Sequence, residues 1–228
     1  MVTQRDIQSL TKLIAPTLGK FQFKRDLMFE VPVAHYLKGF AFDRSGFDKA
    51  MFYVEAFIMP LYVPSDHISL LFSQRLTDNG SQIWFYDTTK RERLADALRN
   101  IMVHQGLPFL ALVNDPYDLL ERVSELHSNL QDMWVQVAVA YSAVLANQEN
   151  KAGEMLQLAE AKIQEQISEL QKHKITSAEH TELLQQVREV TQCYAQGHKV
   201  ASRLLRSWEL LTLRKLGLTD FIDSDRSE

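Results

Sequence analysis

The segment that decides the fold is a predicted strand from Phe47 to Val63, which reads MFYVEAFIMPLYV from Met51 onward. Its aromatic and β-branched residues favour an extended strand. Apolar side chains occupy both faces of that strand, with Phe52, Val54 and Ile58 on one face and Met51, Tyr53 and Phe57 on the other. A strand that buries both faces is typical of the interior of a sheet, so we expect a sheet to form around this segment.

A hairpin is expected after this strand. Residues 67–76 and 81–87 are strand-like and flank Thr77-Asp78-Asn79-Gly80. Asn-Gly tolerates positive φ at both central positions of a turn, which closes an antiparallel hairpin. On the N-terminal side, residues 4–18 predict an amphipathic helix, and residues 21–42 predict a strand pair or an irregular edge region.

A helix is expected to follow the hairpin, from Asp87 or Thr88 to about Gln105. Its apolar stripe consists of Leu94, Ala97, Leu98, Ile101 and Met102. Gly106 should end this helix, because glycine readily adopts the left-handed conformation found at helix C-termini.

The second half of the chain has a different composition. All six prolines lie within the first 116 residues, and eleven of the twelve phenylalanines lie within the first 109. From residue 117 onward there is no proline and there are only three glycines. A long stretch without these turn-forming residues predicts helices.

Local signals place four helices in this half. Asp115-Pro116 combines an N-cap residue with a proline at the first helical position. Further helices are expected at about 132–147 and 152–173, and Thr176-Ser177-Ala178-Glu179, as a capping box, should begin the fourth. Gly197 should break the fourth helix, whose apolar spacing predicts a long antiparallel hairpin with the third.

These patterns together predict an α+β fold. A small, mostly antiparallel sheet with helices is followed by an all-α bundle that contains the long helical hairpin. We expect an α+β domain at residues 1–114, a helical interaction domain at 115–218 and an acidic tail at 219–228, in which Phe221 and Ile222 could dock.

Charge differs between the two halves. Residues 1–114 carry 13 Lys and Arg against 11 Asp and Glu, a net charge of +2, whereas residues 115–228 carry 12 against 18, a net charge of −6. The acidic half repels a phosphate backbone and suits a basic protein surface.

The single cysteine, Cys193, excludes an internal disulfide, and no stretch approaches 18 uncharged apolar residues. The residues after Met1 lead into no apolar segment of the kind that a signal peptide needs. We therefore expect a cytoplasmic protein that does not enter a membrane.

Two segments resemble known families. Trp134, Val137, Ala138 and Tyr141, followed by Ala152, Leu156 and Ala159, resemble one tetratricopeptide repeat at about residues 134–163. That resemblance implies a packed pair of helices. The segment from Met51 to Leu76 resembles small bacterial proteins that serve as immunity proteins or as accessory subunits of defence operons.

The sequence predicts no catalytic residue, metal site or cofactor. Its seven histidines form no His-x-His, His-x-x-x-His or His-Glu-x-x-His pattern, and such spacings are what a zinc site needs. Ser65-Asp66-His67 contains the residue types of a hydrolytic triad. Consecutive residues cannot converge in the required hydrogen-bonded chain, so a turn is expected there instead.

Glu55 stands out because it lies within the apolar strand. A buried carboxylate needs a partner or a raised pKa, and Lys49 or Arg75 could pair with it. Together with Asp43, Asp48 and Asp66, Glu55 suggests an alternative function, that of a nuclease-like enzyme or a nucleic-acid-associated protein.

Basic residues form two clusters. Lys90, Arg91, Arg93 and Arg99 lie near the start of a predicted helix, where cations oppose the helix dipole, which suggests contact with phosphate or an acidic partner. The second cluster surrounds Trp208 near a helix C-terminus, where cations are favoured, and consists of Arg203, Arg206, Arg214 and Lys215.

The leading hypothesis is a non-enzymatic protein-interaction module. It would be an immunity protein or an accessory subunit of a bacterial multiprotein defence complex, bound to another, possibly basic, protein and reaching nucleic acid only through a larger complex. The residues expected to bind the partner are Trp134, Tyr141, Glu154, Glu165 and Trp208.

Overall fold

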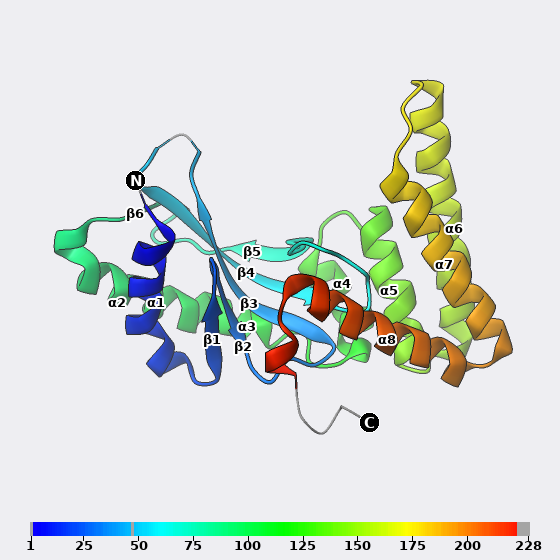
Figure 1. Cartoon of the computed structure of the whole chain (residues 1–228), viewed down its shortest axis with the longest axis horizontal. Coiled ribbons are helices and arrows are strands. Elements are labelled where there is room, and N and C mark those ends of the chain that lie inside the picture. Colours follow the sequence, from blue (N-terminus) through cyan, green and yellow to red (C-terminus); the bar gives the residue numbers. More distant parts are fainter. Residues whose placement is uncertain (1, 47, 223–228) are drawn as a thin grey trace. The chain divides into compact units, whose positions relative to one another are not determined.

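The computed structural model describes residues 2–46 and 48–222, which form the expected α+β fold (Figure 1). The chain divides into two compact units. The sheet unit contains the described residues of 2–59, 69–113 and 220–222, and the helical unit contains residues 60–68 and 114–219. Of the predicted acidic tail, residues 223–228 lie outside the described residues.

Strands of two to ten residues form a single sheet in the sheet unit. They are β1 (Phe21–Lys24), β2 (Leu27–Glu30), β3 (Tyr36–Arg44), β4 (Met51–Pro60), β5 (Phe72–Arg75) and β6 (Trp84–Phe85). Their order across the sheet is β1-β2-β3-β4-β5, and β6 also pairs with β4. The pairs β1–β2, β2–β3, β4–β5 and β4–β6 are antiparallel, as expected from the sequence.

β4 is the interior strand that the sequence predicts. It lies between β3 and β5. Phe52, Val54 and Ile58 on one face are fully buried, and so is Phe57 on the other. Two-sided burial of this kind explains why the segment is apolar at successive positions rather than at alternate ones.

The Asn-Gly turn is confirmed. Asn79 and Gly80 have φ values of 48° and 82°. Asp78 and Ser81 exchange two backbone hydrogen bonds of 2.8 and 2.9 Å. The hairpin predicted around this turn is wrong, because β5 and β6 pair with successive parts of β4 rather than with each other. The long edge of β4 offers both short strands a complete set of backbone partners.

The helix predicted to end at Gly106 continues to Leu110. The helical run consists of η1 (Thr88–Lys90), α2 (Arg91–Ile101), the π-helical turn η2 (Met102–Gly106) and α3 (Leu107–Leu110). A Cβ atom at Gly106 would lie 2.3 Å from Cε1 of Phe40. Glycine is therefore present because the helical run approaches β3 closely, and the predicted role as a helix stop is wrong.

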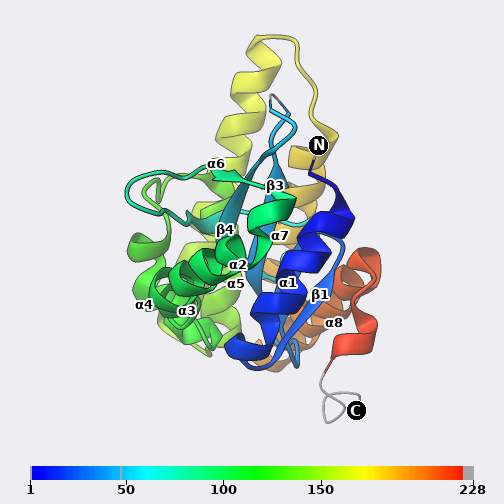
Figure 2. The same cartoon turned by 90° about the vertical axis from the view of Figure 1, so that its left-hand side faces the viewer.

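The N-terminal helix is confirmed as α1 (Gln4–Leu18). It packs against α2, and both lie on the same side of the sheet (Figure 2). Arg99 Nη2 donates a 2.9 Å hydrogen bond to the carbonyl oxygen of Leu13, which ties α2 to α1. Pro16 is accommodated inside the last turn of α1.

Residues 220–222 belong to the sheet unit and include the last two residues of the short η3 (Thr219–Phe221). The ring of Phe221 meets Phe29 edge-on, with centroids 5.1 Å apart. The amide of Val33 donates a 2.9 Å hydrogen bond to the carbonyl oxygen of Phe221. This part of the predicted tail is thus held by packing and by a backbone hydrogen bond.

The helical unit contains five longer helices. They are α4 (Pro116–Leu126), α5 (Met133–Leu145), α6 (Glu149–Lys172), α7 (Ala178–Gln196) and α8 (His198–Leu216). α5 packs against α4, α6 and α8, while α6 packs against α7 and α7 against α8. The α6–α7 pair is the long hairpin that the sequence predicts (Figure 1). Among the described residues, no helix combines the length and apolar character needed to cross a membrane.

Local capping signals define most of the helix ends. Asp115 accepts hydrogen bonds from the amides of Tyr117 and Asp118 and begins α4, as predicted. Gly197, with φ of 132°, separates α7 from α8, as predicted. The N-cap of α7 is Ser177, which accepts from the amide of His180, so the predicted cap at Thr176 is wrong by one residue.

Replacement of Gly106 by Ala tests the close approach of η2 to β3. We expect a loss of about 1–3 kcal/mol in the free energy of unfolding, because the buried ring of Phe40 must shift to admit the new methyl group. Gly153→Ala in α6 is the control. Its Cβ would meet only Cε1 of Tyr194, at 3.9 Å, so this variant should be neutral or gain up to about 1 kcal/mol. Equal urea denaturation midpoints for both variants would contradict the close contact.

Candidate functional site: binding faces of the helical unit

Glu55 is held by β5, the neighbouring strand. Its carboxylate accepts hydrogen bonds of 3.1 and 2.8 Å from Arg75 and one of 3.0 Å from Ser73. The guanidinium of Arg75 also lies over the ring of Tyr53, 4.5 Å from its centroid. These contacts compensate the buried charge, and they identify Arg75 rather than Lys49 as its ion-pair partner.

The acids proposed for a nuclease-like site do not gather. Asp43 and Asp48 lie near the loop between β3 and β4, whereas Asp66 belongs to the helical unit. Within residues 2–46 and 48–222, no group of three His, Cys, Asp or Glu side chains is placed to share a metal ion.

Ser65, Asp66 and His67 form a turn, as expected. Ser65 Oγ donates a 2.8 Å hydrogen bond to the backbone carbonyl of His67 and is therefore not directed at the imidazole. Asp66 Oδ1 lies 2.9 Å from His67 Nδ1, and this hydrogen bond lowers the pKa of the exposed Asp66 carboxyl. The geometry is that of a local polar turn.

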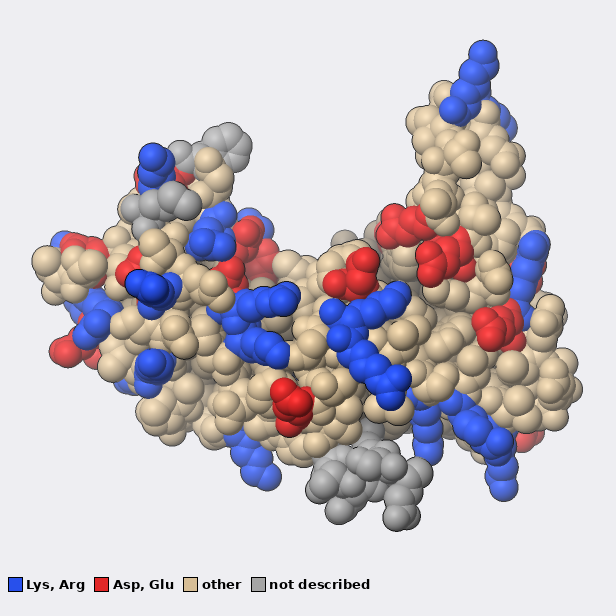
Figure 3. All heavy atoms as spheres, viewed as in Figure 1, with Lys and Arg blue, Asp and Glu red and all other residues tan. Residues whose placement is uncertain are grey.

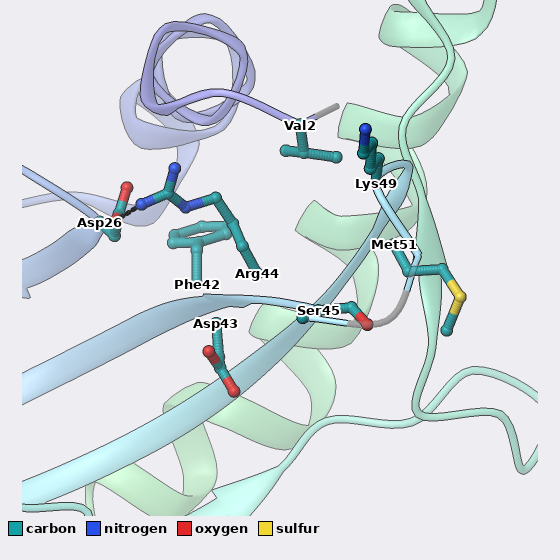
Figure 4. A pocket seen from close by; sticks show the side chains of 9 residues that line it. Val2, Asp26, Phe42, Asp43, Arg44, Ser45, Lys49 and Met51 are labelled. Carbon is teal, nitrogen blue, oxygen red and sulfur yellow. Dashed lines mark hydrogen bonds and ion pairs between the residues drawn. The ribbon is translucent and has the colours of Figure 1, made fainter.

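A shallow pocket of about 430 Å³ opens at the β3–β4 end of the sheet (Figure 4). Arg44 extends across Phe42 and forms a 3.1 Å ion pair with Asp26, while Lys49 lies beside Val2. Because Arg44 is already paired with Asp26, an anionic ligand would have to compete with that carboxylate. We therefore place the candidate functional surfaces elsewhere.

The first basic cluster does not form one free face. Arg91 donates a 3.0 Å hydrogen bond to Ser9, and Arg99 bonds both Asp96 and the backbone of α1. Lys90 lies 3.6 Å from Asp87. Two of the four proposed phosphate contacts, Arg91 and Arg99, thus connect α2 to α1, and Arg93 is exposed.

Two of the aromatic residues proposed as partner contacts lie inside the helical unit. Tyr141 has no exposed surface and packs against Trp208, which is 9% exposed, with ring centroids 5.8 Å apart. Burial raises the pKa of the Tyr141 hydroxyl well above its usual value. Side chains this buried cannot contact a partner, so the expected roles of Tyr141 and Trp208 are corrected to core packing. Trp134 is half-buried.

The two proposed glutamates do lie on one exposed strip of α6. The strip, called the α6 face, consists of Glu154, Leu158, Ala161, Glu165 and Glu169. Positions three and four residues apart share one side of a helix. Leu158 is 54% exposed, so this acidic face has an apolar centre.

A second exposed strip lies on α8. This strip, called the α8 face, consists of Lys199, Arg203, Ser207, Leu210 and Arg214. Leu210 is 40% exposed. Basic side chains gather over α8 in the view of Figure 3, and acidic ones lie on the α6–α7 hairpin. These cations are evident in the sequence, and their spacing along a helix is the signal that could have predicted a shared face.

The comparisons with known proteins assign neither a family nor a function to this chain. No protein-family model, curated protein or solved structure matches this chain significantly.

A double-mutant cycle on Glu55 and Arg75 tests the structural role of the carboxylate. We expect Glu55→Gln and Arg75→Gln to be strongly non-additive, with a coupling free energy of about 0.5–3 kcal/mol in the free energy of unfolding. The matched cycle on Arg122 and Glu125, an exposed pair 3.5 Å apart, should give a coupling of about 0.3–0.5 kcal/mol. Additive effects at Glu55 and Arg75 would rule out the compensating ion pair.

Proposed function

We propose that the chain is a non-enzymatic protein-interaction module and that the helical unit supplies its binding surface. The observation that carries this proposal is the α6 face. It places an exposed leucine between carboxylates on a helix of 24 residues. An exposed apolar side chain within a charged strip gains free energy when a partner covers it.

The chemistry of this face defines the partner. Glu154 and Glu165 lie on either side of Leu158 and Ala161, so a complementary surface carries cations on either side of an apolar residue. An amphipathic helix with Lys or Arg and Leu has that pattern. A phosphate backbone would be repelled by the carboxylates.

The more specific proposal is an immunity protein or an accessory subunit of a bacterial defence complex, acting in the cytoplasm. It is supported by the resemblance of residues 51–76 to such proteins. It predicts that a further protein of the complex is encoded beside this chain and that the two co-purify when they are expressed together.

Charge reversal on the α6 face tests the interaction. We expect the Glu154→Lys, Glu165→Lys variant to bind an immobilised amphipathic helical peptide of Lys and Leu more slowly than the wild type does, because exposed charges mainly set the association rate. The difference should shrink at high ionic strength. Association kinetics at two salt concentrations measure both effects.

Glu182→Lys, Glu189→Lys on α7 is the matched control, since it makes the same charge change on exposed residues of the other hairpin helix. It should bind more like the wild type. Circular dichroism should show that both variants are folded. Equal association rates for the wild type and both variants would argue against the α6 face as the binding surface.

A further inference from the structure

The α6 and α8 faces have the same spacing of residues when α6 is followed toward its C-terminus and α8 toward its N-terminus. From Glu154 the positions of the α6 face advance by 4, 3, 4 and 4 residues, ending at Glu169. From Arg214 the positions of the α8 face recede by the same 4, 3, 4 and 4 residues, ending at Lys199. Two helices laid antiparallel would therefore meet position by position.

The paired positions are chemically complementary. In the antiparallel register each acid of the α6 face meets a base of the α8 face, and the leucines meet each other. The pairs are Glu154 with Arg214, Leu158 with Leu210, Ala161 with Ser207, Glu165 with Arg203 and Glu169 with Lys199. Small residues at the central pair allow the helices to approach closely.

A parallel arrangement lacks this match. Placing Glu154 opposite Arg203 and Glu165 opposite Arg214 would put Leu158 opposite Ser207. The antiparallel arrangement also opposes the two helix dipoles. The paired strip covers 16 residues on each helix, or about 22 Å of helix axis at 1.5 Å per residue.

The charges on both faces are available. Among the described residues, none of the three cations of the α8 face forms an ion pair. In the part of the chain that the structure describes, Glu165 and Glu169 pair only with Lys162 and Lys172, one turn away on the same helix. Such exposed pairs contribute little to stability, so exchanging them for pairs with another molecule costs little.

We propose that the partner of the α6 face is the α8 face of a second copy of this chain, docked antiparallel. This inference rests on the proposed function and names its partner. Every copy carries both faces, so the contact closes as a dimer when it forms twice and extends further when it does not. The exposed leucines of α8 favour a protein partner over nucleic acid, because the phosphates and sugars of a duplex offer them little apolar surface.

Charge exchange between two variants tests the proposal. One variant carries Glu154→Lys and Glu165→Lys, and the other carries Arg203→Glu and Arg214→Glu. Alone, each variant brings like charges together at the contact, so self-association should weaken by at least about tenfold relative to the wild type. Mixed in equal amounts, each variant meets an opposite charge on the other, and association should return. Sedimentation velocity at low salt measures all three samples.

Two further proteins act as controls. The chain carrying all four substitutions should associate by itself, because the charge pattern is reversed on both faces. Leu158→Ser with Leu210→Ser should weaken association without changing net charge. Circular dichroism verifies that every variant is folded, so a loss of association cannot be ascribed to unfolding.

The outcomes separate this inference from the proposed function. A wild-type chain that stays monomeric, or a mixture that fails to associate, overturns the self-docking. If the monomeric wild type still binds the Lys and Leu peptide through Glu154 and Glu165, the interaction module stands with a different partner. A third outcome is that the wild type binds a DNA or RNA oligonucleotide, does not self-associate, and loses the nucleic acid when Arg203→Glu and Arg214→Glu are introduced. That outcome would identify the α8 face as a phosphate-binding surface instead.

Discussion

Two-sided burial of β4 is the constraint on which the sheet unit depends. A strand covered on both faces can accept neighbours only along its edges, and β4 has neighbours on both sides: β3 lies on one, and on the other β6 pairs with residues 51–52 and β5 with residues 55–58. The single charge in its buried part, Glu55, must be compensated from a neighbouring strand. Arg75 and Ser73 provide this compensation, and the Glu55–Arg75 pair favours one register of β5 over its alternatives.

The helical unit buries its apolar side chains around one central helix, α5. α5 is nearly enclosed, with Val137, Tyr141 and Val144 fully buried, and the other helices pack around it or around each other. Helices α6 and α8 bury one side only, and their apolar stripes leave the opposite side to solvent. The exposed α6 and α8 faces are therefore a consequence of one-sided packing, and their composition is free to serve binding.

The net charge of the second half of the chain does not show how its charges are distributed over the helices, and that distribution matters for binding. The second half of the chain carries a net charge of −6, yet α8 contains five Lys and Arg and a single Glu. The acids concentrate on the other helices. α8 is thus a basic helix in an otherwise acidic unit, which favours contacts between complementary faces rather than a uniform repulsion between copies.

Local chemistry in the sequence determined the α+β class, the interior position of β4, the Asn79-Gly80 turn, the caps at Asp115 and the break at Gly197. Each depends on backbone preferences or on spacing within a few residues. The exposure of Glu154 and Glu165 could also be predicted from the sequence, since polar residues opposite the apolar stripe of a helix face solvent. Only the tertiary structure decided which strands pair with β4, because two short strands can pair equally well with each other or with a long neighbour. The tertiary structure also decided that Gly106 allows the helical run to approach Phe40 closely and that Tyr141 and Trp208 are buried. Those outcomes depend on residues far apart in the chain, whose packing no local pattern encodes.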